Sequence, residues 1–248
     1  MSVDEIREPI NLTPETGIAE LESSADADRA ARTFGKLARH GIRQWALTGG
    51  FAVERHDPRA SARALNDLDF VAPGFDSIPT SLASDFLFRH VHPLDPPGKI
   101  ILQFVDRDTA LRIDVFRACG DTLHRAIVVD QIRLVSAADL VARAARLLLD
   151  LADGVPVQAK HANDYLRLVE RVSPAEMEAA WPDHRRPSHP AEFREARAVL
   201  RNLIPARPDL LTVPEYSRNA EAICARCHPV TGFPLADPRT ILALLGYC

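Results

Sequence analysis

The spacing of apolar and polar residues changes along the chain, from a period of two in the first half to a helical period after residue 136. Within residues 45–71, an apolar run at residues 45–47 precedes two glycines, a polar stretch and the sequence Asp-Leu-Asp-Phe at residues 67–70. Alternation of this kind is typical of a strand with one buried face. We therefore expect a strand, a glycine turn, a short helix, a polar loop and a second strand.

Other segments of the first half carry similar signals. Residues 25–40 repeat apolar side chains at helical spacing, and Gly41 favours a helix end at that point. Residues 99–105 and 111–116 are apolar runs on either side of the turn sequence Asp-Arg-Asp. They predict an antiparallel hairpin whose second strand lies inside the sheet. We also expect a short helix at residues 76–86, a strand at residues 86–91, and a strand or bent pair of strands at residues 124–135.

From Ser136 onward the pattern is helical. Ser136 and Asp139 resemble a capping box at the start of a long apolar helix. Prolines and glycines then delimit further helices, expected at residues 158–172, 174–181, 191–203, 214–224 and 238–245. The predicted fold class is α+β (α/β). Its expected parts are an arm at residues 1–24, a core with N-terminal helices and a small mixed or antiparallel sheet at residues 25–135, and a helical bundle at residues 136–248.

Composition sets broad limits on the class of protein. The 248 residues, 46% hydrophobic and 26% charged, are typical of a globular chain with one large or two small domains. A formal net charge of −4 gives no overall basic surface for nucleic acid, although a local basic groove stays compatible with it. The sequence shows neither a secretory signal nor an apolar run of membrane-spanning length. We expect a cytoplasmic location, no membrane partner and reduced cysteines.

Two aspartates in the second strand are candidate metal ligands. Asp67 and Asp69 are two residues apart, so both side chains leave the same face of the strand. Magnesium prefers oxygen ligands and is usually held by one or two carboxylates together with substrate phosphates. Asp114, on the strand expected at residues 111–116, would add a third carboxylate to a two-metal site and accept a proton from an attacking hydroxyl.

The glycine turn is the candidate phosphate site. Gly49 and Gly50 open a helix, where backbone can approach phosphate oxygens and the first N–H groups point toward an anion. The Thr48 hydroxyl is adjacent to this turn. Arg63, four residues before Asp67, is a candidate guanidinium ligand of a triphosphate.

Taken together, these residues resemble the nucleotidyltransferase superfamily, the DNA polymerase beta-like fold. The matching positions are Gly49-Gly50, Asp67-Leu68-Asp69 and Asp114. Residues 58–71 also resemble a segment of bacterial minimal nucleotidyltransferases, including type IV toxin-antitoxin toxins, although Pro58-Arg59-Ala60-Ser61 stands farther from the aspartates than usual. Residues 160–168 resemble a helical Lys-Asp-x-x-Asp segment of such enzymes, which implies that Lys160 approaches nucleotide phosphates.

The resemblance implies an enzyme that transfers a nucleoside monophosphate from an NTP to an acceptor, with Mg²⁺ or Mn²⁺ and release of pyrophosphate. The acceptor, a small molecule, an RNA or a protein, stays open, as do the base of the NTP and the oligomeric state. The alternative is a catalytically silent module on the same fold that binds nucleotide or a partner. Diglycine turns and Asp-x-Asp pairs are each common by chance, so the hypothesis depends on their combination in this order.

The cysteines allow a second, less favoured metal hypothesis. Cys224 and Cys227 form a Cys-x-x-Cys pair, which is half of a tetrahedral zinc site, and His228 or Cys248 would have to complete it. The same residues match a c-type haem attachment motif, which belongs to exported proteins. We favour ordinary thiols over zinc, and zinc over haem.

Overall fold

The computed structural model of this chain describes residues 24–42, 44–57, 64–129 and 132–213. The expected α+β fold is confirmed in these residues. Several expectations fall outside them, namely the N-terminal arm, the helices at 214–224 and 238–245, and any role of Arg63, Cys224, Cys227, His228 and Cys248.

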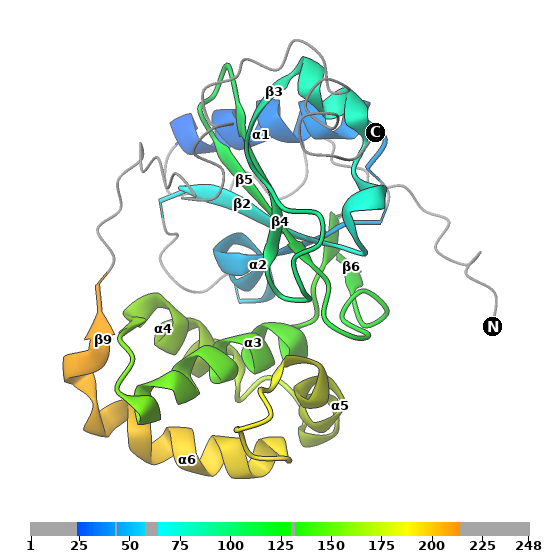
Figure 1. Cartoon of the computed structure of the whole chain (residues 1–248). Coiled ribbons are helices and arrows are strands. Elements are labelled where there is room, and N and C mark those ends of the chain that lie inside the picture. The colour runs from blue at the N-terminus through cyan, green and yellow to red at the C-terminus, as the bar shows by residue number, and fades with distance from the viewer. Residues whose placement is uncertain (1–23, 43, 58–63, 130–131, 214–248) are drawn as a thin grey trace.

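A mixed seven-stranded sheet forms the centre of the described structure (Figure 1). Its order is β3-β4-β5-β2-β1-β7-β6. Pairing is parallel between β2 and β5 and between β1 and β7, and antiparallel elsewhere. The strands are β1 (Ala46–Thr48), β2 (Asp67–Ala72), β3 (Phe86–Val91), β4 (Ile100–Asp106), β5 (Arg112–Arg117), β6 (Ile127–Val129) and β7 (Ile132–Leu134).

Helices cover the sheet from two sides. Helix α1 (Ser24–Arg39) packs on the sheet in the upper part of Figure 1, and α2 (Gly49–His56) connects β1 to the loop before β2. The lower part consists of α3 (Ala137–Leu149), α4 (Ala159–Leu168), α5 (Pro174–His184) and α6 (Phe193–Ala206). A 3-10 helix η5 (Asp150–Asp153) follows α3, η6 (Pro208–Leu210) follows α6, and a short parallel pair joins β8 (Val157–Gln158) to β9 (Leu211–Thr212).

Two apolar clusters follow from the alternation within the strands. The first contains Phe34 of α1 with Leu47, Leu68 and Phe70 of the sheet, all at most 1% exposed. The second joins the opposite sheet face and α2 to the four helices of the lower part. Because successive strand residues point to opposite faces, one sheet contributes to both clusters.

Most expected elements are confirmed. The hairpin of β4 and β5 is antiparallel, and β5 lies inside the sheet between β4 and β2. Ser136 caps α3 by accepting a hydrogen bond from the Asp139 N–H. Helices α4, α5 and α6 begin within two residues of their expected positions. No helix in the described residues is long and apolar enough to cross a membrane.

The prediction of a single helix at residues 76–86 was wrong. This segment forms two 3-10 helices, η3 (Phe75–Ser77) and η4 (Thr80–Ser84), before β3 begins at Phe86. Pro79 separates them. A residue that precedes proline is disfavoured in the helical region, and Ile78 is accordingly extended, with φ −89° and ψ 117°.

Candidate metal and nucleotide site

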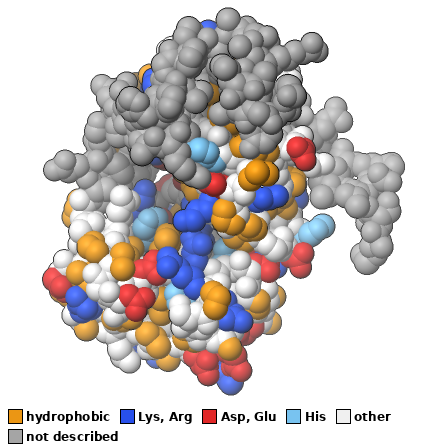
Figure 2. Space-filling view, in the orientation of Figure 1, with side chains coloured by type: hydrophobic (Ala, Val, Ile, Leu, Met, Phe, Trp, Pro, Cys, Tyr) orange, Lys and Arg blue, Asp and Glu red, His pale blue; other side chains and the backbone are white. Residues whose placement is uncertain are grey.

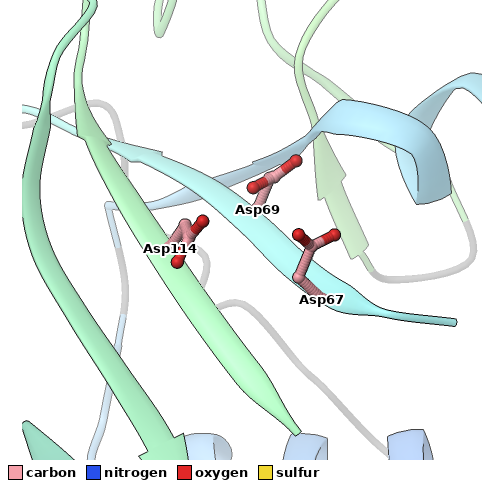
Figure 3. A group of neighbouring side chains, drawn as sticks. All are labelled: Asp67, Asp69 and Asp114. Carbon is pink, nitrogen blue, oxygen red and sulfur yellow. The ribbon is translucent and has the colours of Figure 1, made fainter. Parts of the chain in front are cut away.

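Three carboxylates meet on one face of the sheet, as Figure 3 shows. The parallel register of β2 and β5 places Asp69 directly beside Asp114. One oxygen from each of Asp67, Asp69 and Asp114 lies within 4.8 Å of the other two. Leu68, between the two β2 aspartates, points to the opposite face and is fully buried. The convergence expected from sequence is thus observed in the geometry.

Polar neighbours hold this carboxylate cluster in place. Gln103 on β4 donates from Nε2 to Asp114 Oδ1 at 2.8 Å. The Arg112 guanidinium ion-pairs with Asp67, and its Nε lies 3.4 Å from Asp114 Oδ1. Sequence analysis did not identify Arg112. The available signal was its position two residues before Asp114 on the same strand, which directs both side chains to one face.

The electrostatics of the cluster favour a bound cation. Burial, followed by repulsion from Asp67 and Asp114, raises the pKa of Asp69 to about 8, against partial compensation from Arg143 and Lys160. Burial also raises the pKa of Asp114, although Arg112 and Gln103 oppose this rise. Without a cation, these shifts favour the protonated form of Asp69 at neutral pH, and a bound cation would displace that proton. Three hard oxygen donors at this spacing fit a magnesium or manganese ion.

Gly49 brings the backbone against the aspartates. Its φ of +71° lies in the left-handed region, and a Cβ at this position would stand 1.9 Å from Asp69 Oδ2. Both facts require glycine, the first through conformation and the second through space. The glycine turn and the carboxylate cluster are consequently in direct contact.

The N-terminus of α2 opens into a cleft beside the cluster. Gly49, Gly50 and Phe51 line this cleft together with Asp67 and Asp69. N–H groups in the first turn of a helix lack intrahelical partners and favour an anion. Thr48 is the N-cap residue of α2, but its hydroxyl makes no capping hydrogen bond. Gly49 and Gly50 therefore line the cleft beside the aspartates, whereas Thr48 does not, and the phosphate-binding role of these residues stays a prediction.

The opposite wall of the cleft comes from the helical part. Lys160, His161 and Asp164 of α4 line it, and so does Arg143 of α3. Lys160 stands in the first turn of α4, where its charge acts on Asp69. Sequence analysis placed Lys160 at the site but did not identify Arg143. Arg143 lies within a long apolar helix, and only the packing of α3 against the sheet shows which of its polar residues face the aspartates.

Glu54 also lines the cleft and is ion-paired. Arg167 Nη1 lies 2.7 Å from Glu54 Oε1, and Arg167 Nη2 donates to the Asp57 carbonyl at 2.5 Å. These contacts join α2 to α4 across the two halves of the described structure. They link the helix that follows the glycine turn to the helix that carries Lys160.

No protein-family model matches this sequence, and no curated protein matches it significantly. Among solved structures, the chain is similar to the antibiotic-resistance factor ANT(2'')-Ia, whose solution structure reveals substrate-regulated conformation dynamics. The alignment covers 70% of this chain and 94% of that protein, at 13% identity and a TM-score of 0.44. A similarity at this identity and TM-score carries no conclusion about the site, whose description rests on its own geometry.

Proposed function

We propose that this chain is a metal-dependent nucleotidyltransferase, which transfers a nucleoside monophosphate from an NTP to an acceptor and releases pyrophosphate. The observation that carries the proposal is the contact between the three carboxylates and the Gly49 turn. A cation site and a helix N-terminus side by side can hold a metal ion and a triphosphate together. Either feature alone would leave half of such a substrate without partners.

Each residue has a distinct role in the proposal. Asp67, Asp69 and Asp114 would hold the metal ions that accompany the triphosphate. Asp114, held by Gln103, takes the proton from the acceptor hydroxyl as the new P–O bond forms and the bond to pyrophosphate breaks. When bound, magnesium would neutralise phosphate charge and lower the pKa of the acceptor hydroxyl.

The remaining residues position the triphosphate. The N–H groups of Gly49 and Gly50 face its oxygens, and Lys160 approaches from α4. In phosphoryl transfer generally, catalysis comes mainly from such positioning and from charge stabilisation. The cleft between α2 and the α3–α4 wall is the proposed place for the nucleotide.

The first prediction concerns the three carboxylates. Asp67→Asn, Asp69→Asn and Asp114→Asn should each lower turnover by at least about 100-fold, because each removes charge that holds the metal and substrate. Turnover is measured as pyrophosphate release from labelled NTPs with magnesium, offered RNA, protein and small-molecule acceptors. Without metal, the melting temperature of Asp69→Asn should not fall, since this change relieves burial and repulsion of a charge, whereas Asp67→Asn and Asp114→Asn also weaken contacts with Arg112 and Gln103.

Asp153→Asn is the matched control, because Asp153 is exposed and outside the cleft. It should leave pyrophosphate release unchanged. Full turnover by the triad variants would contradict the proposal. Tight binding of NTP by the unaltered protein, with no pyrophosphate released for any acceptor, would instead identify a nucleotide-binding module without catalysis.

A further inference from the structure

Two arginines of α3 lack a carboxylate partner although both are half-buried. Arg143 and Arg146 stand one helical turn apart on the same side of α3. The Arg143 guanidinium carbon lies 4.2 Å from the centre of the Phe116 ring, and its hydrogen bond to Thr48 Oγ1 is long, at 3.5 Å. Arg146 makes no hydrogen bond or ion pair with any residue in the described part of the chain, and its Nε is closed to solvent.

The nearby carboxylates are already paired with other cations. Asp139 and Asp183 both bind Arg125, at 2.7 and 2.6 Å. Asp150 binds Arg186 at 2.7 Å. Among the described residues, no carboxylate forms an ion pair with Arg143 or Arg146, although the charge of Arg143 acts on Asp69 and Asp114.

This arrangement is unfavourable unless an anion completes it. Burial lowers the pKa of Arg146, and repulsion from Arg143 and Arg186 lowers it further. A desolvated cation without a partner is costly, whereas a hydrogen-bonded ion pair offsets that cost. Guanidinium groups match the oxygens of phosphate in paired hydrogen bonds. A phosphate group has the charge and the oxygen geometry to serve as the counter-ion.

A small cavity adjoins both arginines. Its polar and charged lining comprises Thr48, Arg117, Cys119, Thr122, Asp139, Arg143, Arg146 and His184, and the Asp139 carboxylate is already paired with Arg125. Gly98 has φ +79°, and a Cβ there would stand 3.1 Å from Cys119 Sγ and 3.4 Å from Arg146 Nη1, so the backbone at Gly98 approaches both side chains closely. Figure 2 shows Lys and Arg side chains gathered near the middle of the face that is drawn.

The cavity is close to the carboxylate cluster. Arg143 lines both the cavity and the cleft that contains Asp67 and Asp69. On β5, Asp114 and Phe116 point to the same face about 7 Å apart, and Arg143 stands over Phe116. A phosphate at the arginine pair and a hydroxyl at Asp114 can therefore belong to the same acceptor molecule.

We propose that Arg143 and Arg146 bind a phosphate group of the acceptor, so that the molecule receiving the nucleotidyl group is a phosphate ester. This inference rests on the proposed function, which defines the acceptor side of the cleft. A nucleic-acid chain end and a small sugar phosphate share the required chemistry. A polycationic acceptor would meet repulsion from both guanidinium groups.

The test measures binding to the full chain in magnesium-free buffer. The probes are a fluorescein-labelled decaribonucleotide with a free 3′ hydroxyl, followed by anisotropy, and ribose 5-phosphate, followed by calorimetry. At least one probe should bind, and Arg143→Gln and Arg146→Gln should each weaken it by about 10-fold or more. The control Arg201→Gln removes an exposed arginine outside the cavity and should leave the affinity unchanged. Binding of RNA alone identifies a nucleic-acid end, and binding of ribose 5-phosphate identifies a small phosphate ester.

Stability provides a second measurement. Arg146→Gln removes a charge without a partner and should not lower the melting temperature, whereas Arg125→Gln breaks two ion pairs and should lower it. A fall for Arg146→Gln as large as that for Arg125→Gln would give Arg146 a purely structural role and overturn the inference. Failure of both probes to bind, or unchanged binding by both α3 variants, would overturn it as well.

The two proposals can fail separately. If the triad variants abolish transfer while Arg146→Gln leaves the acceptor KM unchanged, the nucleotidyltransferase stands and the phosphate site falls. If no acceptor is modified but probe binding depends on Arg143 and Arg146, the phosphate site stands without the reaction.

Discussion

Gly49 brings the N-terminus of α2 against the carboxylate cluster. Its left-handed conformation costs about 1–2 kcal/mol for any residue with a Cβ, and the Cβ would overlap Asp69 Oδ2. Gly49→Ala should therefore displace Asp69 and lower pyrophosphate release by at least about 10-fold, with a loss of about 2–4 kcal/mol in the free energy of unfolding. Steady-state kinetics and urea unfolding measure the two effects.

Gly35→Ala is the matched control for Gly49→Ala. Gly35 lies within α1, and a Cβ there meets no atom within 4 Å. Alanine at a helical position stabilises by about 0.5–1 kcal/mol relative to glycine. The control should therefore be slightly more stable than the unaltered chain and equally active. Equal activity of Gly49→Ala would show that the contact with Asp69 is not required.

Metal binding should raise the free energy of unfolding. Mutual repulsion among Asp67, Asp69 and Asp114 is relieved by a divalent cation, which binds the folded chain alone. We expect about 2–3 kcal/mol of stabilisation at a manganese concentration 100-fold above the Kd. Differential scanning calorimetry with and without manganese measures it. The shift should vanish in Asp69→Asn, and an equal shift in that variant would place the metal elsewhere.

At the level of elements, Asp139 joins the start of α3 to the segments before and after it. The carboxylate is fully buried, and Arg125, His184 and Ser136 hydrogen-bond to it. Burial alone would raise the pKa of Asp139, but these hydrogen bonds outweigh it and hold the pKa at about 2. The ionised form is therefore stabilised by folding.

A depressed pKa gives a definite pH dependence. Because the unfolded pKa is about 3.9, Asp139 contributes about 2–3 kcal/mol of stability above pH 4, and this is lost as pH falls toward 2. Asp139→Asn should cost a similar amount at pH 7. Urea unfolding of both chains at pH 7 and pH 3 measures the difference, which should shrink at the lower pH. A difference independent of pH would assign the cost to packing.

Across the whole molecule, the sheet lies between two apolar clusters. Val71 and Val135 belong to the cluster that also contains Trp181 of α5, while Trp45 lies in the cluster under α1. The domain boundary expected near Ser136 stays a prediction. Removing the helices would expose an apolar sheet face, so the two halves should depend on each other for stability.

Coupled halves should unfold in one transition. The chain contains two tryptophans, both fully buried, one in each cluster. Trp45→Phe leaves Trp181 as the reporter of the helical part, and Trp181→Phe leaves Trp45 as the reporter of the sheet. In each variant, the urea midpoint of tryptophan fluorescence should coincide with the urea midpoint of ellipticity, which measures the loss of secondary structure. A fluorescence midpoint that differs from the ellipticity midpoint of the same variant would indicate independent domains.

Local patterns were sufficient for most of the elements. Alternation around Asp67 and Asp69 determined that strand and its polar face, because side-chain direction in a strand depends only on position. The exception was the segment around Pro79, where one proline overrides a weak helical pattern. Arg63 and the cysteine pair at 224 and 227 lie outside the described residues, so their roles stay predictions.

The sequence by itself determined the strands, the glycine turn and the three acidic residues, because these depend on contacts between near neighbours in the chain. Only the tertiary structure decided that Arg112 pairs with Asp67, that Arg143 stands over Phe116, and that Arg146 has no counter-ion among the described residues. Such contacts depend on strand register and on how a helix is rotated against the sheet. Both are set by packing across the whole core, which no local pattern encodes.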